Sequence, residues 1–112
     1  MISKTLMAAS TRPIILAILA RGDDYGYSII QRVKDISGGQ LEWADGMLYP
    51  VLQRMEMDGL ILSRWKISEG KRPRRYYTIT QSGKEDLVSE LKSWRSVWQA
   101  LVHLTKPVPA GE

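Results

Sequence analysis

Basic side chains gather in one short segment of this 112-residue chain, and the chemistry they offer is the binding of phosphate groups. Between positions 64 and 77 the local net charge is +5, from one acidic residue, Glu69, and six basic ones: Arg64, Lys66, Lys71, Arg72, Arg74 and Arg75. The whole chain carries +4, so the remainder sums to −1. Such a cluster in an otherwise balanced domain is expected where a protein contacts a nucleic-acid backbone. A hairpin that is merely solvated would explain why the segment is charged, but not why nearly all of its charges are positive.

Few other residues could carry chemistry. The sequence has no cysteine and a single histidine, His103, which excludes disulfides, thiolate nucleophiles, zinc ribbons and metal sites built on two histidines. No pairing of a nucleophile with a base is evident, so we expect a protein that is not an enzyme and that uses no cofactor and no metal. His103 is interpreted as a surface residue.

Length and composition predict one folded domain, since 44% of the residues are apolar and 25% are charged. The longest apolar run, residues 13–20, has eight residues, whereas a membrane-spanning helix needs roughly 20. Arg12 lies directly before this run, and Ile18 stands where a cleavage site needs a small residue, so an export signal is disfavoured. We therefore expect a cytoplasmic protein that does not bind membranes.

The first predicted element that could position the basic segment is a helix over residues 13–21. Ser10 or Thr11 is the expected cap, and Pro13 would lie in the first turn, where its missing N–H costs nothing. A helix that is apolar nearly all round must be covered on two sides. We expect it to pack on its own core and on a second surface, for which a second subunit is a candidate.

Two further helices are predicted from apolar residues at helical spacing. One begins near Tyr25 and ends at the glycine pair 38–39. The other runs from about 46 to 58, with Asp45 as its N-cap and Gly59 just beyond its end. Pro50 predicts a slight kink or a start one residue late.

A β-hairpin should follow, with the basic residues at its tip. In residues 60–67 the apolar side chains Ile61, Trp65 and Ile67 alternate with polar ones, which predicts a strand with one apolar face. After a turn-rich segment, residues 74–80 form the second strand. Tyr76 and Tyr77 would lie on opposite faces, one in the core and one on the surface.

The last predicted element is a long helix capped by Thr80 and carrying an apolar seam. Its large side chains are spaced four, three, four and three residues apart, as in a coiled-coil interface: Leu87, Leu91, Trp94, Trp98 and Leu101. Residues 106–112 cannot continue a helix because they contain two prolines. We expect a DNA-binding domain over 1–80, a dimerisation helix over 81–105 and a loose tail over 106–112.

Three short helices followed by a cationic hairpin form the order of a winged helix-turn-helix. The predicted fold is therefore mainly α with a small β-hairpin, extended by a long C-terminal dimerisation helix. In such folds one helix enters the major groove, while the hairpin, or wing, contacts the flanking backbone.

Several short segments carry a more specific signal: YGY at 25–27, GMLYPVL at 46–52, MEMDGLI at 55–61, Trp65, RYYTIT at 75–80 and Gly83. In this order they closely resemble the PadR family of transcriptional regulators, over about residues 13–98. Met47 departs from that family's usual serine or threonine, which removes a hydroxyl contact to phosphate. The resemblance implies a homodimeric repressor from the branch that lacks a separate C-terminal effector domain, in which the last helix pairs with the partner's first and last helices.

Candidate DNA-binding residues follow from the third helix and the wing. Met47, Pro50, Gln53 and Arg54 are expected on the exposed side of the helix, where Gln53 could read adenine and Arg54 guanine or a phosphate. A merely solvated helix face stays an equal alternative. Tyr49 could direct its hydroxyl to phosphate or simply pack. On the wing the candidates are Lys71, Arg72, Arg74 and Arg75, the last of which could instead be held within the fold.

Candidate dimerisation residues are Ile15, Leu87, Leu91, Trp94, Trp98 and Leu101. Trp94 and Trp98 are first expected to pack at that interface. Trp94 also falls where drug-responsive members of the resembled family carry a stacking tryptophan, so Trp94 and Trp98 are candidate ligand residues for a planar aromatic or cationic effector. The leading hypothesis is a dimeric repressor on a pseudo-palindromic operator, relieved by such an effector. A DNA-binding dimer without a ligand and a winged-helix module that binds proteins stay open.

Overall fold

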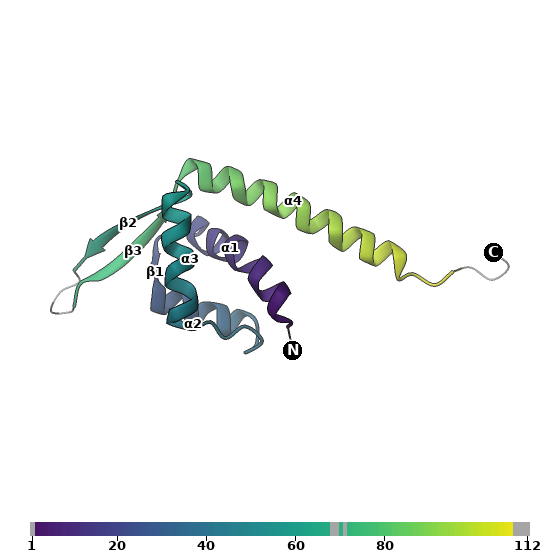
Figure 1. Ribbon diagram of the computed structural model, residues 1–112, viewed down its shortest axis with the longest axis horizontal. Coiled ribbons are helices and arrows are strands. Elements are labelled where there is room, and N and C mark those ends of the chain that lie inside the picture. The colour runs from purple at the N-terminus through teal and green to yellow at the C-terminus, as the bar shows by residue number, and fades with distance from the viewer. Residues whose placement is uncertain (1, 68–69, 71, 109–112) are drawn as a thin grey trace.

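The computed structural model describes residues 2–67, 70 and 72–108 (Figure 1). Four helices and three short strands follow one another in this part of the chain: α1 (Lys4–Ala20), β1 (Asp24–Tyr25), α2 (Gly26–Ile36), α3 (Asp45–Met57), β2 (Ile61–Lys66), β3 (Arg74–Ile79) and α4 (Gln81–Leu104). The predicted fold, a winged helix-turn-helix extended by a long C-terminal helix, is confirmed. None of the described helices is both long and apolar enough to span a membrane.

Helix α1 begins nine residues earlier than predicted. Ser3 is its N-cap and accepts a hydrogen bond from the Leu6 N–H at 3.1 Å. The expected caps Ser10 and Thr11 instead donate their hydroxyls to the Met7 carbonyl, at 3.0 and 2.8 Å. Pro13 therefore lies inside the helix, where it removes one backbone hydrogen bond. Burial of the apolar residues around it offsets this loss.

The sheet has one strand more than predicted. β1 pairs with β3 in antiparallel register, Asp24 opposite Tyr77 and Tyr25 opposite Tyr76, and the sheet order is β1-β3-β2. A strand of two residues is too short to show alternation in a sequence. It ties the start of α2 directly to the wing.

Helix α3 starts at Asp45 and is continuous through Pro50. Its N-cap is Ala44 rather than the predicted Asp45, whose carboxylate lies in the first turn, where it complements the helix dipole. Gly59 follows the C-cap with φ of +77°, as its predicted place just beyond the helix requires.

The core lies where α1, α2 and α3 meet the inner end of the sheet. Its fully buried side chains come from all of these elements: Ile15, Leu16, Leu19, Ile29, Leu48, Leu52, Met55 and Ile61. Trp65 and Ile67 were expected on the same buried face as Ile61, but they are 67% and 70% exposed. The hairpin leaves the core of the domain beyond Ser63, so these two side chains of its outer half have no core to pack against.

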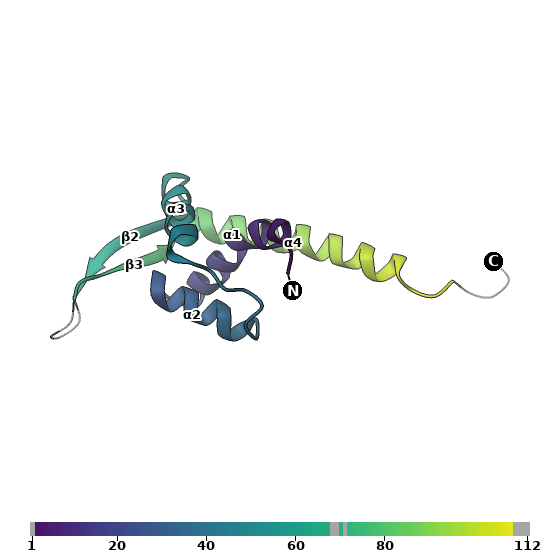
Figure 2. The ribbon, with the colours of Figure 1, turned by 60° about the horizontal axis from the view of Figure 1, so that its bottom comes forward.

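Helix α4 starts on the domain and then runs away from it, which gives the molecule a length of 71 Å against widths of 29 and 21 Å (Figures 1 and 2). Thr80 caps it as predicted, accepting from the Gly83 N–H at 3.0 Å and donating to the Gly59 carbonyl at 2.7 Å. Arg12 and Asp86 form an ion pair at 3.2 Å between α1 and α4. Nearly all the large apolar side chains beyond Leu87 remain exposed.

Candidate nucleic-acid interface

The exposed side of α3 is a stripe along the whole helix. Leu48, Leu52 and Met55 turn into the core. The opposite side presents Gly46, Tyr49, Pro50, Gln53, Arg54 and Met57 to solvent. Four of the five residues that we expected on α3 for DNA contact, namely Tyr49, Pro50, Gln53 and Arg54, therefore lie together on one surface.

Met47 does not belong to this stripe. It is half-buried, packs against the core and lines a cavity beside Met7 and Thr11 of α1. The expectation that Met47 lies nearer the exposed side is corrected: its position on the helix turns it toward α1, and an unbranched apolar side chain fills that gap.

Arg54 is only loosely held. Its Nε lies 3.7 Å from Asp58 Oδ1 one turn further along, and its side chain is 77% exposed. An ion pair of this kind is weak in water, so the guanidinium is free to turn toward an incoming base or phosphate.

Tyr49 packs against the first residue of α2. A Cβ atom at Gly26 would overlap the Tyr49 hydroxyl and lie 2.7 Å from its Cζ, so a larger residue there would force the Tyr49 side chain to shift. The hydroxyl thus lies at the N-terminus of α2, where free backbone N–H groups make the electrostatic potential positive. The ring packs, as one of the two interpretations of Tyr49 requires, and the residue stays 43% exposed, so the phosphate contact stays a prediction.

A hollow of about 670 Å³ lies between the wing, the start of α2 and Tyr49. Its lining combines aromatic rings with arginines: Tyr25, Gly26, Tyr27, Tyr49, Trp65, Arg72, Pro73, Arg74, Arg75 and Tyr77. Sequence reasoning did not select Tyr25, Tyr27 or Trp65 as site residues, although YGY and Trp65 were noted as part of a motif. A concave, basic and aromatic surface next to an exposed helix suits a nucleic-acid backbone.

The wing distributes its cations over two faces, because neighbouring residues of a strand alternate. Trp65 lies opposite Arg75 on the face that turns toward α3, whereas Arg64 lies opposite Tyr76 on the other face. On that other face Arg74 stacks 4.4 Å from the Tyr25 ring centre, and Lys66 lies 5.3 Å from that of Tyr76. The two rings meet edge to face at 5.2 Å. Arg74 is therefore exposed but pre-oriented by an aromatic ring.

Arg75 is held within the fold. Its Nε donates to Ser63 Oγ at 2.9 Å, and its Nη2 lies 3.4 Å from Glu56 Oε1 on α3. Ser63 also donates its backbone N–H and its hydroxyl to the Glu56 carboxylate. This network joins the wing to α3 and gives Arg75 a positioning contact, while its side chain stays 47% exposed and also lines the hollow, so its contact with DNA stays a prediction. Sequence reasoning missed Glu56 and Ser63, whose only signal was the motif at 55–61.

The remaining wing predictions divide as follows. Arg72 is exposed beside the hollow, and Lys71 lies outside the described residues. Tyr77 is the buried member of the tyrosine pair, as predicted for one of the two, and burial raises the pKa of its phenol above the usual 10.0. It therefore stays a neutral part of the core.

The apolar seam of α4 is largely open to solvent. Leu91, Trp98 and Leu101 are 48%, 65% and 51% exposed, while Leu87 packs partly on the core. Trp94 is half-buried and donates its indole N–H to Glu90 at 3.2 Å. With Leu91 it forms one wall of a groove of about 250 Å³ whose other wall is α1, through Ser10, Pro13, Ile14 and Ala17.

Ile15 is corrected as a dimerisation residue. It is 0% exposed within the single chain and has no surface left for a partner. On α1 the groove is bordered instead by the half-buried Ile14 and the exposed Ala17. Along a helix that is apolar nearly all round, the sequence could not separate the side facing its own core from the outer side.

Sequence comparison agrees with the geometry. A family model described as the transcriptional regulator PadR-like family matches residues 15–89. Protein X of Lysinibacillus sphaericus is 31% identical over 98 residues, which are 87% of this chain and 89% of that protein. The negative transcriptional regulator PadR of Bacillus subtilis is 33% identical over 73 residues, 65% of this chain but only 40% of that protein.

Solved structures are also similar. A transcriptional regulator from Clostridium thermocellum superposes with a TM-score of 0.85 at 25% identity, and the match covers 95% of this chain and 100% of that one. A PadR family transcription regulator from Clostridium difficile gives a TM-score of 0.74 at 30% identity, covering 87% of this chain and 99% of that one.

Proposed function

Because this chain belongs to the PadR-like family of transcriptional regulators and is thus a DNA-binding regulator, we propose that it is a homodimeric repressor of a pseudo-palindromic operator. The observation that carries the dimer is the exposed apolar seam of α4, with Leu91, Trp98 and Leu101 about half or more exposed on a helix that leaves its own domain. A contiguous apolar surface on a projecting helix is unfavourable in water and favours burial against a second copy.

The two-fold dimer would present two α3 helices to successive major grooves. In a helix-turn-helix dimer the half-sites lie about 34 Å apart, one turn of DNA. Residues 1–80 would form the DNA-binding part and residues 81–105 the dimerisation helix, with 106–112 as a tail.

Each candidate residue has a role in this proposal. Gln53 and Arg54 would read base edges, with Pro50 beside them, and Tyr49 would bond a phosphate at the start of α2. Arg72 and Arg74 would attract flanking phosphates, as would Lys71 by its sequence position. Arg75 would act through Glu56 by fixing the angle between wing and α3.

Binding to the DNA directly upstream of the protein's own gene, against a scrambled duplex, tests the repressor proposal. Fluorescence anisotropy across a salt series should give tighter binding to the native duplex at physiological salt. Gln53→Ala should reduce that preference, whereas Gln99→Ala, exposed on α4, should not. Arg72→Ala should weaken both duplexes alike and lower the salt slope by about 1, with Arg95→Ala as its control.

Two results would count against the proposal of a sequence-specific repressor. Equal, weak binding to both duplexes that collapses with salt would leave only a generic electrostatic patch. Binding of DNA that is unaffected by removal of the wing arginines would favour the alternative of a winged-helix module that binds proteins.

A planar aromatic or cationic effector at Trp94 is the second part of the proposal. The supporting observation is the open groove between α1 and α4 in which Trp94 lies half-buried, close to where the partner's α4 would pack. Trp98 follows one turn later on the same seam. An aromatic slot at a dimer interface could take a flat ligand and change the tilt of the two α3 helices.

Tryptophan fluorescence tests the effector site with a panel of planar aromatic cations. Trp94→Ala should abolish ligand-induced quenching while light scattering still gives a dimer, and Trp65→Ala on the wing should leave most quenching in place. If Trp94→Ala quenches like the unchanged protein, or if no compound quenches, the DNA-binding dimer without a ligand is the better description.

A further inference from the structure

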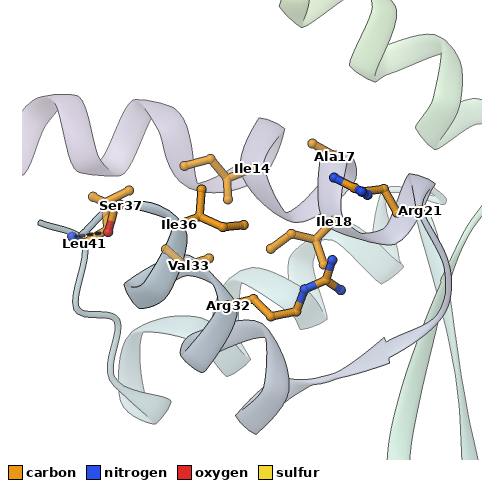
Figure 3. Close-up of a pocket in the computed structure, with 9 residues that line it drawn as sticks. All are labelled: Ile14, Ala17, Ile18, Arg21, Arg32, Val33, Ile36, Ser37 and Leu41. Atoms are coloured by element: carbon orange, nitrogen blue, oxygen red, sulfur yellow. Dashed lines mark hydrogen bonds between the residues drawn. The ribbon is translucent and has the colours of Figure 1, made fainter. Parts of the chain in front are cut away.

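Another cavity lies on the α2 side of α1, apart from the DNA-binding surface and next to the groove at Trp94, with which it shares Ile14 and Ala17 (Figure 3). Its volume is about 240 Å³. Six apolar side chains from α1, α2 and the segment after α2 form its walls: Ile14, Ala17, Ile18, Val33, Ile36 and Leu41. Ile36 is 76% exposed, which leaves a large apolar side chain at the rim without cover.

Apart from Ser37, the polar residues of this trough are two arginines that stand at one end of it, as Figure 3 shows. Arg32 is paired with the buried Asp24 at 2.9 Å, which neutralises one charge but occupies only one of its nitrogens. Arg21 has no carboxylate within 4.0 Å among the described residues. Since Asp24 offsets the charge of Arg32 from outside the cavity, the end of the cavity that holds Arg21 and Arg32 has an excess of one positive charge.

The combination selects a class of ligand by its chemistry. An apolar body would displace water from the isoleucine and valine walls, and an anionic group would pair with Arg21 at the open end. Sites for drug-sized ligands start at about 300 Å³, so a cavity of 240 Å³ fits a smaller molecule. An amine of the same shape would meet a cation, and an alcohol could accept a hydrogen bond from arginine but would lack the negative charge that completes the ion pair.

We propose that this cavity binds a small monocarboxylate with one compact apolar body, whose carboxylate pairs with Arg21 and with the free N–H groups of Arg32. The binding itself does not depend on the proposed repressor function. Ile14 and Ala17 line both this cavity and the groove at Trp94, so an occupant would contact the same stretch of α1 on which a second chain could pack.

Calorimetry and methyl NMR with hexanoate and benzoate, compared with 1-hexanol and hexylamine, test the site on the full chain. We expect one carboxylate bound per chain, with shifts at the methyls of Ile14, Ile18 and Ile36, and much weaker binding of the alcohol and the amine. Arg21→Gln keeps the apolar stem but removes the charge, and it should weaken carboxylate binding about ten-fold or more. Arg95→Gln on α4 should have no effect.

Two further variants separate this site from its alternatives. Trp94→Ala should leave carboxylate binding unchanged, so the proposal and the effector site at Trp94 can fail independently. Binding that is equal for hexanoate and 1-hexanol, or insensitive to Arg21→Gln, would overturn the proposal. The absence of carboxylate binding at millimolar concentration would overturn it as well. If Ile36→Gln then weakened self-association, the trough would be part of a contact between two copies of the chain.

Discussion

Trp98→Glu is expected to convert the proposed dimer into monomers and to lower operator affinity by a factor of about 100 to 10,000. The side chain is 65% exposed in the single chain, so the substitution should not disturb folding of the domain. In the dimer, however, the carboxylate would have to enter the apolar seam beside Leu101 without a partner. A monomer contacts one half-site only and loses the gain from binding two together. Light scattering and anisotropy on the same samples measure both effects.

Ser96→Glu is the matched control for this experiment. Ser96 lies half a helical turn from Trp98 and is also exposed, so the same charge is introduced on the opposite side of α4. The mass and the DNA affinity should then stay close to those of the unchanged protein. A dimeric Trp98→Glu with full affinity would place the subunit interface somewhere other than on this seam.

The elements that the sequence predicted well are those with a long period and a chemical end signal. Thr80 and the seam from Leu87 to Leu101 predicted α4 closely, because a threonine cap and 4-3 spacing leave little choice of register. Gly59 marked the end of α3 for the same reason, since the residue after a helix often needs positive φ. Local signals of this kind do not depend on what the element later packs against.

The predicted start of α1 was wrong because the sequence offers more than one residue that could cap the helix. Ser10 and Thr11 precede the strongest apolar run and looked like its caps, yet Ser3 opens the helix seven residues before Ser10. Hydroxyls inside a helix bond back to the carbonyl three or four residues earlier, as both do to Met7. A sequence shows that a residue can cap but not whether the chain before it is already helical.

Site residues were harder to predict than elements, because their roles depend on contacts far along the chain. For Arg75 the sequence left open DNA contact or a place in the fold, and it could not show the contacts with Ser63 and with Glu56, which is 19 residues away. Ile15 and Met47 were placed on the right helices but on the wrong sides, since an apolar residue fits either a core or an interface. Pro50, Gln53 and Arg54 lie on the exposed side as predicted, because Leu48, Leu52 and Met55 fix the opposite face.

Gly83→Ala is expected to destabilise the protein by about 1–3 kcal/mol, a large part of the roughly 5–15 kcal/mol available to a domain. A Cβ atom at position 83 would overlap the Leu60 carbonyl oxygen and lie 2.7 Å from Ile79 Cγ1. The first of these neighbours is backbone and cannot rotate away, so α4 must lift from the turn between α3 and β2. Urea unfolding at fixed protein concentration measures the loss, since a dimer's stability depends on concentration.

The same substitution at Gly46 is the control, because it lies in the first turn of α3 and a Cβ there meets nothing within 4 Å. Gly46→Ala should leave stability unchanged or raise it by up to about 1 kcal/mol, since alanine favours a helix over glycine. If the two variants unfold alike, α4 does not depend on its close approach to Leu60. If only Gly83→Ala is destabilised, the angle at which α4 leaves the domain is fixed at this contact. The spacing of the two α3 helices in the proposed dimer would then be set there as well, because α4 carries the seam that joins them.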